Sequence, residues 1–286
     1  MPRVMVLCAG FGTRLRPLTN ELPKPLVPLG DRSLLGRIAQ YLNGFGVTEL
    51  VINTHHLMRE FNNISNELSV NVQVVPESEI RGTAGGVAGA RQYLETPALV
   101  WNGDIWCEPP VSELLASQAP FTLLVAPRPK GQGSVGLGER SNVVRLRGEC
   151  FGDEVRGADY VGIAALSAQI LERLPEHGCL VGDVALPWLR EGHSIQTLEL
   201  SGAWSDLGNL ERYLAANLEW LGERDHWLGA GAQVAPEVQL SKSIVGAGAR
   251  VQGEGVLEDC VVWPRAVATA PASQTVFGRG FAQRVS

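Results

Sequence analysis

A glycine-rich segment near the start of the chain carries the residue types that grip a phosphate-rich ligand. It follows a short apolar run and reads CAGFGTRLRPLTNELPKP from Cys8 onward. Gly10 and Gly12 let backbone amides come close to phosphate oxygens. Arg14 offers a fork of cationic donors, and Lys24 offers a compact charge on a long stem. The segment therefore predicts a site for a nucleoside triphosphate.

The local charge and the motif spacing narrow this prediction. Four basic residues and a single acid, Glu21, lie between Met1 and Gly30, although the formal net charge of the chain is −6. A P-loop would need a lysine directly after its last glycine, whereas the first lysine is Lys24, between prolines. A Rossmann fingerprint would need a third small residue where Leu15 stands. Both of these motifs are excluded.

The whole segment resembles the signature of the sugar-1-phosphate nucleotidyltransferases, which runs from a strand through A-G-x-G-T-R-L-x-P-L-T to P-K-P. The matching residues are Ala9, Gly10, Gly12, Thr13, Arg14, Leu15, Pro17, Leu18, Thr19, Pro23, Lys24 and Pro25. The resemblance implies that nucleotide is bound by Ala9, Gly10, Gly12, Thr13 and Arg14. It also implies catalytic roles for Arg14 and Lys24.

Two aspartates lie in sequences similar to the metal-binding motifs of the same family. Asp104 follows an apolar run in Asn-Gly-Asp, and Asp206 lies in Trp-Ser-Asp-Leu-Gly-Asn. Either acid alone equally fits a turn or a helix cap. The resemblance implies that both are metal ligands, and two carboxylates with phosphate oxygens and waters suit Mg²⁺. Asn209 replaces the threonine of the family motif, and it is itself a good helix cap.

Further segments resemble the parts of the family that contact the base and the sugar. The run from Glu77 through Gly82 and Thr83 is similar to the G-T-A-G turn, which implies that these three residues lie at the base. The sugar 1-phosphate is assigned to Gly162 and Asp183. The lysine of the usual E-K pair is missing, and Tyr-Val-Gly-Ile ahead of a strand resembles the branch of N-acetylmuramate-1-phosphate uridylyltransferases.

Apolar runs that alternate with helical patterns predict a doubly wound, mainly parallel α/β sheet with a Rossmann-like arrangement over residues 1–225. The expected strands are Val4–Leu7, Leu50–Asn53, Val72–Val75, Leu99–Trp101 and Phe121–Ala126, and the expected helices include Ser33–Asn43 and Thr83–Leu94. Small or apolar residues then recur at steps of six, which predicts a short parallel β-helix over 226–270. An irregular glycine-rich tail is the alternative. Residues 271–286 show no pattern and are expected to form a C-terminal tail.

The resemblance implies that this β-helix is left-handed, as in many members of the family. Because short solenoids leave their end coils uncovered, homo-oligomerisation through the tail is a hypothesis.

The composition excludes several classes of protein. The chain is 45% hydrophobic and 19% charged, and no apolar run reaches the length of a membrane span. Its acidic balance argues against nucleic-acid binding. The five cysteines are odd in number, widely spaced and without a C-x-x-C pair, so neither a disulfide framework nor a zinc site is predicted. A cytoplasmic protein with mostly buried thiols is expected.

The function implied is transfer of a nucleotidyl group from a nucleoside triphosphate to a sugar 1-phosphate. Two alternatives stay open: a non-catalytic regulatory subunit of a nucleotidyltransferase complex, and a cytidylyltransferase for a phospho-alcohol such as phosphocholine. The base and the sugar also stay open. The tail and the G-T-A-G turn favour guanylyl transfer to mannose 1-phosphate, whereas Tyr-Val-Gly-Ile favours uridylyl transfer to an amino sugar 1-phosphate.

Overall fold

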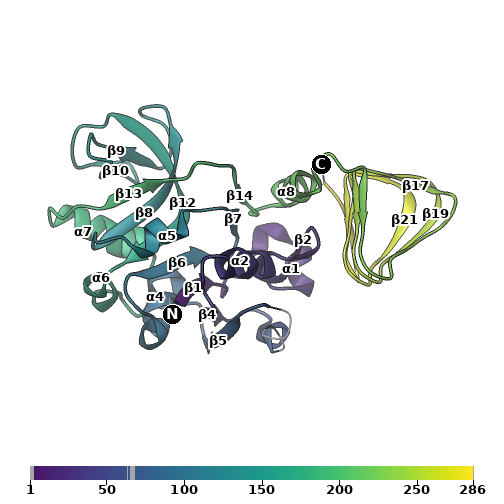
Figure 1. Ribbon diagram of the computed structural model, residues 1–286, viewed down its shortest axis with the longest axis horizontal. Helices are drawn as coiled ribbons and strands as arrows, with labels where there is room; N and C mark the ends of the chain where they lie inside the picture. The colour runs from purple at the N-terminus through teal and green to yellow at the C-terminus, as the bar shows by residue number, and fades with distance from the viewer. Residues whose placement is uncertain (1–2, 63, 65–67, 286) are drawn as a thin grey trace. The chain divides into compact units, whose positions relative to one another are not determined.

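Consecutive β-branched and apolar residues form the parallel strands at the centre of the main sheet (Figure 1). The computed structural model of the chain describes residues 3–62, 64 and 68–285. Its central strands are β1 (Arg3–Leu7), β4 (Glu49–Thr54), β5 (Asn71–Pro76) and β6 (Ala98–Asn102). They lie in the order β5-β4-β1-β6, and all three neighbouring pairs are parallel. The four strands expected here are confirmed.

The strand order creates a switch point beside β1. From β1 the chain moves outward to β4 and β5 on one side, then returns to place β6 on the other side. In such sheets ligands bind beyond the carboxyl ends of the strands that flank the reversal. The segments after Leu7 and Asn102 are therefore brought to one edge of the sheet.

Antiparallel strands extend this parallel centre. The long strand β12 (Arg156–Leu166) pairs antiparallel with β6, and β8 (Phe121–Arg128) pairs antiparallel with β12. The remaining strands of the sheet are β9 (Val135–Leu137), β10 (Val143–Leu146), β11 (Glu149–Cys150) and β13 (Gln196–Glu199). The sheet is thus mixed, with a parallel core, in agreement with the predicted mainly parallel α/β class.

Helices cover the sheet because its central strands are apolar on both faces. On one face Met5, Val51 and Val100 pack in a cluster with Ala84 and Val87 of α4 (Gly82–Ala90). The alternate residues of β1 and β4 are also fully buried. The other helices and turns around this sheet are α2 (Leu34–Asn43), η3 (Met58–Phe61), η4 (Arg91–Tyr93), α5 (Val111–Leu115), α6 (Ala168–Glu172), the π-helical turn η5 (Leu180–Ala185) and α7 (Leu186–Arg190), with the short strand β7 (Ile105–Cys107) after β6.

The chain divides into two units that are each discontinuous in sequence. The first unit contains the sheet and comprises the residues up to Gly10 together with Ile38–Trp204. The second unit comprises Phe11–Arg37 and the chain from Ser205 on. Most of the glycine-rich signature therefore clusters with the C-terminal part of the chain.

The second unit holds the rest of the signature, one long helix and the coils. Its elements are η1 (Thr13–Leu15), α1 (Leu18–Glu21), η2 (Lys24–Leu26), β2 (Pro28–Leu29), β3 (Arg32–Ser33), β14 (Trp204–Asp206), α8 (Leu210–Leu221), β15 (His226–Leu228), β16 (Gln233–Val234), β17 (Val238–Ser241), β18 (Ser243–Val245), β19 (Arg250–Glu258), β20 (Val261–Val262), β21 (Val267–Ser273), β22 (Thr275–Phe277) and β23 (Ala282–Arg284).

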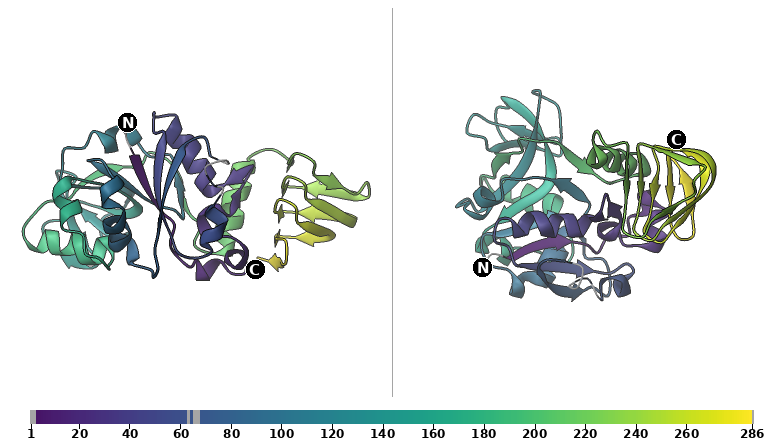
Figure 2. Two further views of the ribbon diagram at one scale, coloured as in Figure 1. Left: turned by 90° about the horizontal axis from the view of Figure 1, so that it is seen from below. Right: turned by 45° about the vertical axis from the view of Figure 1, so that its right-hand side comes forward.

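Parallel strands stack into the predicted β-helix (Figure 2). Ile244 pairs with Val261, and Arg250 pairs with Val267, each 17 residues later. Each coil thus has 17 residues, one fewer than three steps of six. Apolar residues that recur at steps of six up to Leu240 therefore resume at Val245, five positions later. The apolar positions of the later coils form the interior, where Val245 and Leu257 are fully buried.

The predicted end of the coils at residue 270 differs from the structure. Strand β21 continues to Ser273, β22 follows with Val276 and Phe277 buried, and β23 pairs antiparallel with β22. The pattern is hidden after Ala270 because Pro271 is exposed and Ala272 and Ser273 are half-buried, so that large apolar residues return only at Val276 and Phe277. The segment assigned to an unpatterned tail over 271–286 therefore contains the last turn of the solenoid and its closing hairpin.

We expect Met5→Ala to lower the free energy of unfolding by about 2–5 kcal/mol, because Met5 is fully buried in the sheet core and its truncation leaves a cavity. Met58→Ala is the matched control, since Met58 is 43% exposed. That variant should change stability by less than about 0.5 kcal/mol. Urea unfolding followed by circular dichroism measures both, and equal effects would contradict the packing described above.

Candidate functional site

The backbone after β1 is fixed by a buried network of polar side chains in the first unit. The Cys8 amide donates to Asn53 Oδ1 over 2.8 Å, and Asn53 Nδ2 donates to Glu77 Oε1, also over 2.8 Å. Glu77 Oε2 accepts from the Arg81 amide at 3.3 Å. Glu77 is only 3% exposed, so its carboxylate is held almost wholly within the protein. The network ties the ends of β1, β4 and β5 to the start of α4.

The small residues of α4 allow this network to form. A methyl group at Gly86 would lie 3.1 Å from Glu77 Oε1 and closer still to the Asn53 amide. The Thr83 hydroxyl accepts from the Leu180 amide at 2.7 Å, and Gly178 O accepts from the Ala84 amide. Thr83 therefore uses its side chain within the protein.

Asp104 lies at the switch point. The Gly103 amide donates to Leu7 O at 3.0 Å, which joins the turn after β6 to the end of β1. The buried Trp101 indole closes the same turn by donating to Ile105 O at 3.0 Å. Burial raises the pKa of the Cys8 thiol, and the negative charge of Asp104 raises it further. The predicted metal ligand is thus brought next to the predicted nucleotide-binding backbone.

Gly162 lies against the strand that leads to Asp104. It has a φ of +84°, and β12 is irregular between Tyr160 and Ala164 where it passes β8. A methyl group at Gly162 would lie 2.7 Å from Asn102 Nδ2. The position therefore needs glycine both for its backbone angle and for the space that Asn102 occupies.

Asp183, the other residue assigned to the sugar phosphate, lies on η5. Its Oδ2 accepts from the Cys179 amide at 2.6 Å, and its side chain is at the surface. Arg147 donates to Cys179 Sγ at 3.3 Å in the same region. The Asp183 carboxylate thus stabilises the loop before η5.

The signature continues in the second unit as a series of short turns. Gly12 has a φ of +60°, and its carbonyl accepts from the Thr19 hydroxyl at 2.9 Å. Leu15 is fully buried, whereas Thr13 and Arg14 are exposed. The turn therefore anchors itself through Thr19 and Leu15 while it presents Arg14 to solvent.

Lys24 and Asp206 form an ion pair in the second unit. Lys24 is 8% exposed, and its Nζ lies 3.8 Å from Asp206 Oδ1. The other oxygen, Oδ2, pairs with Arg212 over 2.8 Å. Oδ1 is buried and accepts no hydrogen bond from any residue that the structure describes. A carboxylate oxygen in this state fits a cation as its missing partner, which is the chemistry of a Mg²⁺ ligand.

Helix α8 supplies the second cation, which the sequence did not reveal. Asn209 caps the helix by accepting from the Arg212 amide at 2.9 Å, as predicted for this position. The cap places Arg212 in the first turn, from which its side chain reaches Asp206. Asn53 was likewise assigned no role from the sequence. Its place at the carboxyl end of a parallel strand, where ligands bind in such sheets, is a signal that could have identified it.

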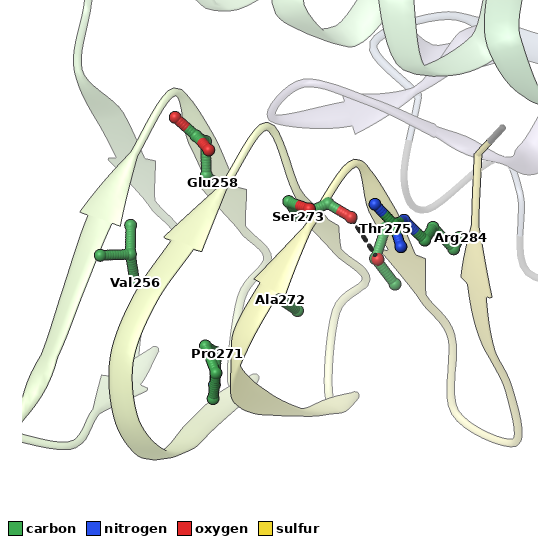
Figure 3. Close-up of a pocket in the computed structure, with 7 residues that line it drawn as sticks. All are labelled: Val256, Glu258, Pro271, Ala272, Ser273, Thr275 and Arg284. Carbon is green, nitrogen blue, oxygen red and sulfur yellow. Dashed lines mark hydrogen bonds between the residues drawn. The ribbon is translucent and has the colours of Figure 1, made fainter.

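A cavity of about 440 Å³ lies on the outer face of the coils (Figure 3). Val256, Pro271, Glu258 and Arg284 are among the residues that line it. These residues belong to β19, β21 and β23, none of which carries a predicted site residue. The cavity is therefore distinct from the groups described above.

A family model for nucleotidyl transferases matches residues 3–127. This part of the chain is therefore similar in sequence to nucleotidyl transferases. The matched region includes the signature, the Asn53–Glu77 network and Asp104. None of the helices that the structure describes combines the length and apolar character needed to cross a membrane.

Among curated proteins, the chain is similar to enzymes of nucleotide-sugar synthesis. It is 28% identical over 239 residues to mannose-1-phosphate guanyltransferase of Schizosaccharomyces pombe, a match that covers 77% of this chain and 64% of the yeast protein. It is 26% identical over 280 residues to probable mannose-1-phosphate guanylyltransferase 3 of Oryza sativa subsp. japonica, covering 91% of this chain and 78% of the rice protein.

A solved structure shares the fold. The chain matches HddC from Yersinia pseudotuberculosis, solved in complex with GMP-PN, with a TM-score of 0.64. The sequences are 23% identical, and the match covers 77% of this chain and all of HddC.

We expect Gly162→Ala to destabilise the protein more than Gly148→Ala. Gly148 has nearly the same φ, +85°, but open space around its Cβ position, so both variants incur about 1–2 kcal/mol of backbone strain. Only Gly162→Ala also pushes on Asn102. Urea unfolding gives both free energies of unfolding, and an equal loss in the two variants would refute the close approach to Asn102.

Proposed function

We propose that the chain is a sugar-1-phosphate nucleotidyltransferase, which converts a nucleoside triphosphate and a sugar 1-phosphate into a nucleoside diphosphate sugar and pyrophosphate. The observation that carries this proposal is the Lys24–Asp206 pair with its hydrogen-bond-deficient oxygen. It joins the last cation of the signature to the predicted metal ligand. The match to the nucleotidyl transferase family model and the named relatives support the same reaction.

The proposed reaction is a single in-line displacement. An oxygen of the sugar phosphate attacks the α-phosphorus of the triphosphate, and the bond from that phosphorus to the bridging oxygen breaks. Pyrophosphate leaves with the electron pair. Phosphate oxygens are nucleophilic at neutral pH, so the protein has to align two anions and offset their repulsion.

Each site residue then has a role in that alignment. The backbone at Ala9, Gly10, Gly12 and Thr13 approaches the phosphates, while Arg14 holds the triphosphate tail and Lys24 meets charge that develops near the α-phosphorus. Glu77, with its network, holds the base-binding turn at Gly82 and Thr83. Gly162 and Asp183 shape the sugar-phosphate end.

We also propose Mg²⁺ as the cofactor, held by Asp104 and Asp206. When bound, the ion polarises phosphoryl oxygens and offsets their negative charge. Arg212 pairs with Asp206 Oδ2 over 2.8 Å and so orients the carboxylate, which the coordination requires. We further propose that the protein is cytoplasmic and forms homo-oligomers. Exposed apolar side chains of the coils, such as Val256 and Val267, form the contact between copies in this proposal.

The test of the reaction is pyrophosphate release by the purified full-length chain with Mg²⁺. GTP, UTP, dTTP, ATP and CTP are each offered with mannose 1-phosphate, an amino sugar 1-phosphate, other hexose 1-phosphates and phosphocholine. We expect turnover with one hexose 1-phosphate, with GTP and UTP as the leading bases. Turnover with CTP and phosphocholine alone, or nucleotide binding without any turnover, would overturn the proposal in favour of a cytidylyltransferase or a regulatory subunit.

We expect Lys24→Ala to lower turnover by roughly 10²-fold or more, because one preorganised charge at the reacting phosphate is removed. Lys130→Ala is the matched control, since Lys130 is exposed on the loop after β8. Circular dichroism confirms that both variants are folded, and initial rates of pyrophosphate release give the ratio. Near-normal turnover of Lys24→Ala would remove this residue from the catalytic machinery.

A further inference from the structure

Glu21, the one acid in the basic first thirty residues, is directed at the C-terminal end of the chain. Its Oε2 accepts from the Arg279 amide at 3.0 Å, and its Oε1 accepts from the Gly280 amide at 2.6 Å. Both amides lie in the turn between β22 and β23. The carboxylate therefore holds the hairpin that closes the coils against the end of α1, three residues before Lys24.

A second connection runs through buried aromatic side chains. The Trp263 indole donates to the Tyr213 hydroxyl at 2.9 Å, and that hydroxyl donates to Pro28 O at 2.7 Å. Trp263 and Tyr213 are at most 1% exposed, so neither bond competes with water. The chain of bonds runs from the coils through α8 to the residue that follows the Lys24 turn.

A third connection fixes the turn after β2. The Gly30 amide donates to Asn217 Oδ1 at 2.9 Å, and Asn217 is fully buried. Any side chain at Gly30 would collide with the Trp220 ring. Helix α8 therefore holds the turn that follows β2, and the coils hold Glu21 in the middle of the segment.

The segment between these anchors has little internal structure to hold it. Its helical pieces, η1, α1 and η2, span three or four residues each, which is too short for a helix to be stable alone. Its internal hydrogen bonds are local, such as that from the Thr19 hydroxyl to Gly12 O, and its long-range contacts come from α8 and the coils. The same segment carries Arg14 and Lys24, whose positions have to be set to fractions of an ångström for phosphate chemistry.

We propose that the β-helix and α8 are positioning elements of the active site. Through Glu21, Tyr213 and Trp263 they hold Phe11–Arg37, the segment that carries most of the signature, in its ligand-binding conformation. None of the three residues has to touch substrate. The link to turnover rests on the proposed function, whereas the link to the conformation of the segment does not.

Amide hydrogen exchange of the protein without nucleotide tests the conformational part. Glu21→Ala removes both accepted bonds, and Tyr213→Phe removes the donor to Pro28 O. Each should speed exchange in residues 12–34 by roughly 2- to 10-fold, the size expected for a lost hydrogen bond. Exchange in β1, β4 and β6 should stay unchanged. Glu21→Gln keeps one acceptor oxygen and should fall between Glu21→Ala and the parent chain.

Matched controls remove the same chemical groups elsewhere on the coils. Glu254→Ala and Glu237→Ala each delete an exposed carboxylate. Neither change should alter exchange in residues 12–34. Trp263→Phe keeps an aromatic ring in the interior and removes only the indole donor, so it serves as the mild variant if Tyr213→Phe unfolds the protein.

The rate measurement adds the functional part. In an active preparation, Glu21→Ala and Tyr213→Phe should lower kcat/KM for the triphosphate, with Glu21→Gln recovering part of the loss. Unchanged exchange in residues 12–34, or equal loss of protection throughout the first unit, would overturn the positioning role. If no substrate pair turns over in the parent chain, the proposed reaction fails, while the exchange result still decides this inference.

Discussion

A lysine buried beside a carboxylate is the interaction on which the arrangement of the second unit depends. Lys24 is 8% exposed and pairs with Asp206, and Asp206 in turn has Arg212 on its other oxygen. Removal from water is costly for Lys24 and for the buried Asp206 oxygen, so both have to be placed by a rigid element. The Asn209 cap, the start of α8 and the turn around Gly208 meet that requirement.

The first unit meets a different constraint: the backbone that follows β1 and β6 has to remain accessible to a ligand at the edge of the sheet. The strand order reverses beside β1, which brings the carboxyl ends of β1 and β6 to one edge of the sheet. The Gly103 amide donates to Leu7 O and the Cys8 amide donates to Asn53 Oδ1, and these bonds fix the loops that follow the two strands. Small residues then keep the approach open. The groups of the proposed site are thus divided between the two units. The first unit offers backbone amides and Asp104, and the second unit offers Arg14, Lys24 and Asp206.

Much of this could be predicted from sequence because it depends on local patterns. Unbroken apolar runs identified the strands, and the signature identified Arg14 and Lys24 in one continuous segment. Arg212 escaped because its role depends on the rotation of α8, and Asn53 escaped because its partners are 45 and 24 residues away. The end of the coils escaped because Pro271, Ala272 and Ser273 interrupt the apolar pattern before Val276 and Phe277. Pairings of this kind arise only when distant segments pack.

The partners of the signature segment are made long after the segment itself. Tyr213 and Arg279 lie 185 and 258 positions after Pro28 and Glu21, the residues to which they donate. At a synthesis rate of about 5–20 residues per second, the segment waits roughly 10–50 seconds on the ribosome for these partners. Its arginines and Lys24 are fixed only when the final coil closes. The nascent chain therefore gains the geometry of this segment only after the coils have been made.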